Sequence, residues 1–294
     1  MKQANMDFAI SLFESITHFK VYSIRPIEAD EHNENYLINL DFVLRLKSIY
    51  DCDGDFFTPE NEYNLLRDLT GSTLHSILPQ VLGYDRKNGN MLRKYVQGTT
   101  IIQDNNGEFI RYLSLIETLK KLHTFKTDSC ITLDPIALYN ALKDKLGEEF
   151  HHDYEDNVLN RAKDALSRSP ICVCHCHLEP HSFVYDESRK ITKLLNFEYG
   201  CLTNEIVDIA SLLCENDISA NMKERLINAY YGIKNVTKAK VDDIEAVMEL
   251  LDMTSYLLAS LRYQETLEEC HFALAKKKMA KIRKRIRFFE SKTR

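Results

Sequence analysis

One stretch of the chain constrains its fold more than any other, the segment from Ile171 to Gly200. It alternates short apolar runs with polar turns, as a set of short strands does. The expected segments are a strand at 171–174, a polar loop at 175–182, a strand at 183–185, a turn at 186–190 and a strand at 191–197 that ends in Glu198-Tyr199-Gly200. The sequence therefore predicts a histidine-rich loop held between strands.

Three segments in and after this stretch have a distinctive order and spacing. They read His175-Cys176-His177-Leu178-Glu179-Pro180-His181-Ser182, Leu195-Asn196-Phe197-Glu198-Tyr199 and Asp208-Ile209-Ala210. Their frame resembles the motifs His-x-Asp-Leu-x-x-x-Asn, Asp-Phe/Trp-Glu-Tyr and Asp-Ile/Leu-Ala of the choline/ethanolamine kinases, in the aminoglycoside phosphotransferase superfamily. The resemblance implies an α+β, protein-kinase-like fold: a small N-terminal lobe with a mixed β-sheet and one helix at 1–97, and a larger, mostly helical lobe at 98–294. It also implies that Asp208 braces the catalytic loop by hydrogen bonds.

The key acids of that frame are replaced. His177 stands where the family has the catalytic Asp, and Ser182 and Asn196 stand at the two metal-binding positions. Phosphoryl transfer depends on carboxylates that hold Mg²⁺ against the phosphates, and a hydroxyl and an amide bring no negative charge. The resemblance implies ATP and Mg²⁺ as cofactors, whereas these replacements argue against both and predict impaired transfer. In an alternative, His177, with His175 beside it, is the catalytic residue, because an imidazole of ordinary pKa serves as a general base near neutral pH.

The same loop offers a rival metal hypothesis, because soft ligands crowd there. They are Cys172, Cys174, His175, Cys176, His177 and His181. Structural zinc sites usually pair cysteines across a turn, whereas alternate residues of one strand point the same way without enclosing an ion. The pattern favours small buried cysteines over a zinc site.

The N-terminal part predicts strands at 21–27, 36–40 and 41–49. The loop at 28–35 has four acids and no glycine, which would repel a triphosphate, whereas the resembling kinases have a glycine-rich loop there. The resemblance gives Arg45 the role of pairing with phosphates and Glu62 that of its partner, on a helix that Thr58-Pro59 begins. It places the adenine-binding hinge at 93–98, with Tyr95 and Val96 as cofactor-binding positions, after a hairpin turn at Asn88-Gly89.

The substrate is harder to predict, since the chain has no Trp with which to cage a quaternary ammonium ion. We expect Tyr199 and Tyr256 to supply aromatic rings and Glu198 a counter-charge for a cationic amino alcohol. Tyrosines and a histidine such as His123 at helical spacing also fit an ordinary core. Two final helices are expected, at 241–261 and 262–289.

Composition sets outer limits. The 294 residues are 44% hydrophobic and 28% charged, without an apolar run long enough to span a membrane. Eight cysteines and the absence of a signal-like start fit reduced thiols in a cytoplasmic protein. Net charge is −6, although residues 276–294 hold ten basic residues and one acid. A packed helix with a solvated basic face explains this run better than lipid or nucleic-acid binding, and no nucleic-acid partner is expected.

The leading functional prediction is a choline-kinase-like phosphotransferase homologue that has lost normal catalysis, a pseudokinase. Two alternatives stay open at this point. One is an active ATP-dependent kinase of choline, ethanolamine or a related amino alcohol. The other is a non-enzymatic interaction scaffold that uses the basic final helix. The sequence does not indicate an oligomeric state.

Overall fold

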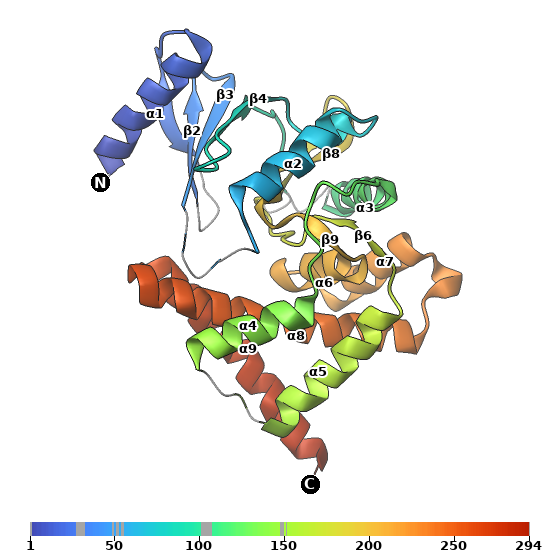
Figure 1. Cartoon of the computed structure of the whole chain (residues 1–294). Coiled ribbons are helices and arrows are strands. Elements are labelled where there is room, and N and C mark those ends of the chain that lie inside the picture. Colours follow the sequence, from blue (N-terminus) through green and yellow to red (C-terminus); the bar gives the residue numbers. More distant parts are fainter. Residues whose placement is uncertain are drawn as a thin grey trace.

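The computed structural model describes residues 2–27, 33–48, 50, 53, 56–100, 108–147, 150 and 152–293. Its N-terminal part is built on a five-stranded sheet with the order β1-β2-β3-β5-β4 (Figure 1). The strands are β1 (Ile24–Ile27), β2 (Asn33–Ile38), β3 (Phe42–Lys47), β4 (Val81–Tyr84) and β5 (Met91–Lys94). Every pairing in this sheet is antiparallel, so the predicted mixed sheet is corrected to an antiparallel one. After the helix Pro59–Thr70, β4 runs in the same direction as β3. The β4–β5 turn then reverses the chain, so β5 meets β3 antiparallel.

Helix α1 (Lys2–Thr17) covers one face of this sheet (Figure 1). Its Ala9 and Phe13 are fully buried against Ile38 and Phe42, and the two phenylalanine rings meet edge to face with centroids 5.3 Å apart. This small cluster is separate from the main core of the molecule. The lobe thus has a hydrophobic layer of its own.

Helix α2 (Pro59–Thr70) lies between the sheet and the helical lobe (Figure 1). Thr58 caps it by accepting a hydrogen bond from the Asn61 N–H, and proline fills the first turn, as predicted. Its leucines belong to the main core rather than to the sheet's cluster. Asn61 Nδ2 donates to the Gly200 carbonyl, and its Oδ1 accepts from the Ile131 N–H, so α2 is anchored to the helical lobe.

The helical lobe holds two short antiparallel strand pairs among long helices. The pairs are β6 (Ile171–Cys174) with β9 (Cys201–Asn204), and β7 (Phe183–Asp186) with β8 (Ile191–Leu194). The helices are α3 (Glu108–Thr124), α4 (Pro135–Leu146), α5 (His152–Ser167), α6 (Ile206–Glu215), α7 (Ala220–Tyr231), α8 (Lys238–Thr266) and α9 (Glu269–Thr293). Short 3₁₀ turns are η2 (His75–Ile77), η4 (Phe197–Tyr199) and η5 (Ile233–Asn235). The two-lobed α+β fold is thereby confirmed.

The final helices differ from the prediction in one respect. Helix α8 runs through Arg262, and the break comes at Leu267, which has a left-handed φ of 58°. Between 254 and 268 there is no glycine or proline to mark an earlier end. In α9 most of the described basic residues are exposed, as predicted, but Lys278 is buried, and its Nζ lies 2.9 Å from Asp252 Oδ1. Among the described helices, none is both long and apolar enough to cross a membrane.

Candidate functional site

The loop at 175–182 is held by one buried carboxylate at the start of α6. Asp208 accepts hydrogen bonds from the backbone N–H groups of His175 (3.0 Å) and Cys176 (2.7 Å) and from His123 Nε2 (2.9 Å). Burial by itself raises the pKa of Asp208, but these donors and the nearby histidines lower it below its ordinary value, so the group is a carboxylate. The predicted brace is confirmed, and so is His123 as a buried, hydrogen-bonded core residue.

His175 is fully buried, and both of its ring nitrogens face backbone groups. Nε2 lies 2.6 Å from the Leu195 carbonyl, and the His177 N–H lies 3.4 Å from Nδ1. Burial lowers the pKa of His175, so the ring is neutral, with Nε2 as donor and Nδ1 as acceptor. The ring therefore ties the loop to the end of β8.

His177 has the reverse character. Its Nε2 lies 3.5 Å from Glu179 Oε2, and its ring packs on that of Tyr199 with centroids 4.7 Å apart. Burial lowers the pKa of His177, but the carboxylates of Glu179, Glu215 and Glu198 outweigh it and raise the pKa to about 9. The side chain is thus an imidazolium at neutral pH, without a lone pair to accept a proton.

Ser182 and Asn196, at the two metal-binding positions, are both buried. Ser182 Oγ has no hydrogen-bond partner among the described residues, and Asn196 has a left-handed φ of 56°. The structure brings three groups of His, Cys, Asp or Glu side chains close enough to share an ion within the described chain, and none of them lies at these positions. The hydroxyl and amide present here bring no negative charge, whereas Mg²⁺ is usually bound through one or two carboxylates. Whether Glu179 or Glu198 supplies such a carboxylate stays open.

The predicted ion pair between β3 and α2 is present and completely buried. Arg45 meets Glu62 in a bidentate pair with both N···O distances at 2.7 Å, and the Tyr84 hydroxyl donates to the same carboxylate. Arg45 also donates to the Gly89 carbonyl in the β4–β5 turn. The predicted pairing is confirmed, whereas the phosphate-binding role of Arg45 and Glu62 stays a prediction.

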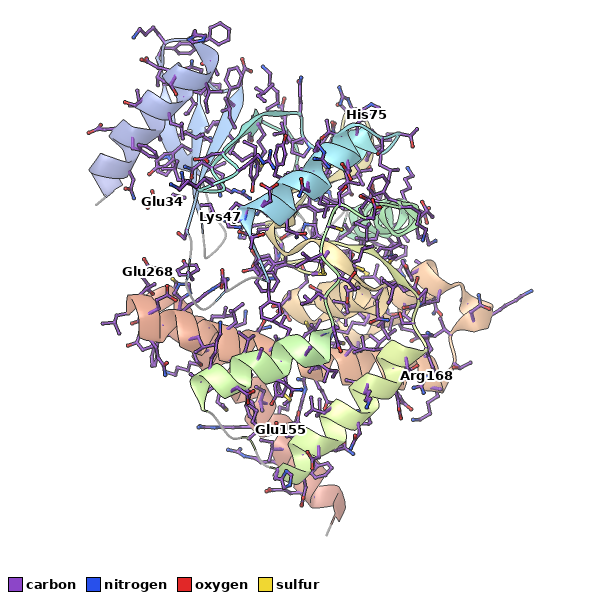
Figure 2. All side chains as sticks on the ribbon, viewed as in Figure 1. Glu34, Lys47, His75, Glu155, Arg168 and Glu268 are labelled. Atoms are coloured by element: carbon purple, nitrogen blue, oxygen red, sulfur yellow. The ribbon has the colours of Figure 1, made fainter. Side chains whose placement is uncertain are left out.

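Glu198 reaches toward the N-terminal lobe. Lys47, at the end of the sheet that faces the helical lobe (Figure 2), lies with its Nζ 3.2 Å from Glu198 Oε2. Asn33 Nδ2 donates to Glu198 Oε1 at 3.0 Å. This link between the lobes was not anticipated from sequence, because Lys47 and Asn33 gave no local signal that pointed to Glu198.

A cleft of about 460 Å³ opens between the sheet and the helical lobe. The predicted hinge residues Tyr95 and Val96 line it together with Asn196. Further lining side chains supply positive charge and hydrogen-bonding groups, namely Arg25, Asn35, Arg93 and His181. The acidic positions 28–32 of the predicted phosphate loop lie outside the described residues. The cleft joins the predicted adenine hinge to one predicted metal position.

A second cavity, of about 100 Å³, is lined by His177, Tyr199 and residues of α8. Tyr256, the other predicted ring, does not line it and instead packs edge to face on Phe150 with centroids 5.6 Å apart. Glu198 is likewise directed to Lys47. The structure therefore does not bring the three predicted substrate residues together.

Comparison with known proteins shows which family this chain belongs to. The model of the phosphotransferase enzyme family (APH) matches residues 23–243, most of the chain. The chain belongs to the phosphotransferase enzyme family. No curated protein matches the sequence.

Solved structures share the fold of this family member at low identity. A choline/ethanolamine kinase family protein from Mesorhizobium loti is 19% identical with a TM-score of 0.77, covering 95% of this chain and 93% of that one. The choline kinase LicA from Streptococcus pneumoniae is 15% identical with a TM-score of 0.73, covering 95% and 99%. A GDP complex of aminoglycoside 2'-phosphotransferase-IIIa is 15% identical with a TM-score of 0.70, covering 96% and 99%.

The cysteines of β6 in this phosphotransferase-family chain lie inside the core, beside His123. Cys172 and Cys174 are buried on β6, with sulfur atoms 3.6 Å apart, and both are free thiols. His123 lies near these two, but its ring nitrogens already face Asp208 and the Tyr230 hydroxyl. The interpretation as small buried side chains on the strand is confirmed for Cys172 and Cys174.

Proposed function

We propose that this chain is a choline-kinase-like phosphotransferase homologue that binds a nucleotide between its lobes but has lost normal magnesium-dependent phosphoryl transfer. The observation that carries the proposal is the pair Ser182 and Asn196 at the metal positions. Their hydroxyl and amide oxygens bring no negative charge against the phosphates. Without that charge, the electrostatic stabilisation on which phosphoryl transfer mostly depends is missing.

The charge on His177 supports the same conclusion. The family's catalytic Asp accepts the proton of the acceptor hydroxyl, as the resemblance implies. A residue that replaces it must be deprotonated to do so, whereas the pKa of His177 is about 9. A positive ring at this position favours an anion nearby but does not activate a hydroxyl at neutral pH. We assign His175 a positioning role, since its nitrogens hold the loop.

Nucleotide binding is supported by the cleft. Relatives of similar fold are described in complex with AMP, GDP and ATP. In this chain, backbone at Tyr95 and Val96 would meet the base, and Arg25 and Arg93 bring positive charge to the same space. Gly98 keeps the hinge close to β7, because a Cβ there would lie 2.2 Å from the Tyr185 carbonyl oxygen. ATP is thus the proposed ligand of the cleft, without a requirement for Mg²⁺.

The test is to restore the two missing carboxylates. The variant His177→Asp with Asn196→Asp is expected to gain Mg²⁺-dependent release of ADP from ATP and at least a tenfold tighter binding of ATP when Mg²⁺ is added. The unaltered protein should show neither. The single replacements are matched controls, because Asn196→Asp alone restores metal affinity without the acid that receives the proton. Turnover of ATP by the unaltered protein that falls in the double variant would contradict the proposal.

A further inference from the structure

The cavity beside His177 has mainly apolar walls. It lies among α4, α6, α8 and β9, and its volume is about 100 Å³. The apolar side chains that line it are Phe57, Leu133, Leu138, Val207, Leu251, Leu258 and Leu274. Such a surface favours an apolar ligand, because moving apolar surface out of water into an apolar pocket is favourable.

The charged groups that reach the cavity are balanced by partners outside it. Each has a counter-ion that does not line the space, so little net charge faces a ligand. The pairs, written with the lining residue first, are His177 with Glu179 at 3.5 Å, Glu215 with Lys278 at 2.6 Å, and Arg262 with Asp53 at 2.8 Å. A ligand that brings a charge of its own would therefore lose its hydration without gaining a new counter-ion.

An aromatic and acidic box at the edge of this cavity is already filled by the protein's own cation. The Arg262 guanidinium lies 4.8 Å from the ring centroid of Tyr50 and 6.0 Å from that of Tyr199. It donates to the Tyr199 hydroxyl at 3.0 Å and meets the Asp53 carboxylate. Rings and a carboxylate are the groups that hold a cationic ligand, and here they hold Arg262.

One buried hydroxyl in the cavity wall has no hydrogen-bond partner among the described residues, and the Ser255 side chain also lines the space. The hydroxyl is Oγ1 of Thr203, which is only 1% exposed and lines the cavity. A buried hydroxyl without a partner is costly and normally finds one. Thr254 also lines the cavity, but its Oγ1 donates to the Leu250 carbonyl at 2.9 Å.

We propose that this cavity binds a small, uncharged, mainly apolar alcohol whose hydroxyl bonds to Thr203, in place of the cationic amino alcohol that the family resemblance implies. The inference rests on the proposed function, since it names the class of ligand for the space beside the loop. At about 100 Å³ the cavity is smaller than one of about 150 Å³ that holds benzene, so it selects for a compact molecule. Longer alcohols would require the cavity to widen.

Two probes of nearly equal shape distinguish the effect of ligand charge on binding from the effect of ligand size. Choline and 3,3-dimethylbutan-1-ol differ by a quaternary nitrogen in place of a quaternary carbon. We expect the neutral alcohol to bind at least tenfold more tightly than choline when both are titrated by ligand-observed NMR into the full chain. Equal or tighter binding of choline, or no binding of either probe, would overturn the proposal.

A pair of threonine variants locates the hydrogen bond. Thr203→Val should weaken binding of the neutral alcohol about fivefold, whereas Thr254→Val should change it less than twofold, because the Thr254 hydroxyl is satisfied internally. Equal losses in the two variants would contradict the assignment to Thr203. All titrations are made without nucleotide or Mg²⁺, so their failure leaves the proposal for the cleft standing, and failure of nucleotide binding leaves these results unaffected.

Discussion

At the scale of single residues, the exchange of a catalytic acid for His177 reverses a charge. An aspartate at this position would be anionic, whereas His177 is held as a cation by Glu179, whose Oε2 lies 3.5 Å away. Glu215 and Glu198 act in the same direction. The sequence predicts a histidine of ordinary pKa here, because the residues that raise the pKa come from three separate segments. The combined effect of these carboxylates on the pKa is visible only in the folded structure.

The raised pKa predicts a pH dependence of stability. The folded pKa of about 9 exceeds the unfolded value of about 6.5, so the charged ring stabilises the fold fully below pH 6.5 and progressively less up to about pH 9. His177→Gln should remove this component. The difference in unfolding free energy between the two proteins should shrink by roughly 3 kcal/mol from pH 6.5 to pH 9, as chemical denaturation would measure. A difference that is constant over this range would contradict the raised pKa.

At the scale of elements, a single carboxylate on α6 holds the loop between β6 and β7. Asp208 joins α6 to the loop through His175 and Cys176, and to α3 through His123. The left-handed backbone at Cys176, with φ of 68°, shows that the loop turns sharply where it is held. The family frame predicted this brace from sequence, because its motif places an acid at the start of the helix.

Replacing the brace should cost stability without a change of volume. Asp208→Asn leaves a neutral amide to meet two backbone N–H groups and a histidine, and we expect a loss of about 3 kcal/mol in unfolding free energy. Asp134→Asn is the matched control, because Asp134 caps α4 by accepting from the Ile136 N–H, and asparagine caps equally well. Equal effects of the two replacements in thermal or chemical unfolding would show that Asp208 is not a brace.

Element boundaries were predictable where turn residues mark them. Asn88-Gly89 lies in the connection between β4 and β5, and Gly89 has a left-handed φ of 73°. The end of α8 was missed because Leu267, a residue with no preference for left-handed backbone, marks it. The pairing of Arg45 with Glu62 was predicted from the family resemblance, which places a basic residue on this strand and its acidic partner on the next helix. The contact of Lys47 with Glu198 joins the two lobes, and no local sequence pattern predicts it.

At the scale of the whole molecule, buried charges tie the separate parts together. Asp252 on α8 lies 2.9 Å from Lys278 Nζ and 2.8 Å from Arg285 Nη1, both on α9. Part of the basic run thus neutralises an acid inside the protein. The exposed basic residues of this run are Lys276, Lys277, Arg283, Lys284 and Arg287. The order of the motifs was enough to predict the two lobes. The contacts of Arg262 with Tyr50, Asp53 and Tyr199 could not be predicted, because these residues come from distant segments of the sequence.

The central claim, a nucleotide cleft without a working magnesium site, is tested most directly by thermal unfolding with ATP, measured with and without Mg²⁺. A ligand at 100 times its dissociation constant stabilises the folded state by about 2.7 kcal/mol, enough to raise the melting temperature by several degrees. We expect an increase with ATP that is the same in both conditions, because Ser182 and Asn196 supply no charge to hold the ion. An increase that appears only with Mg²⁺, or no increase in either condition, would contradict the account.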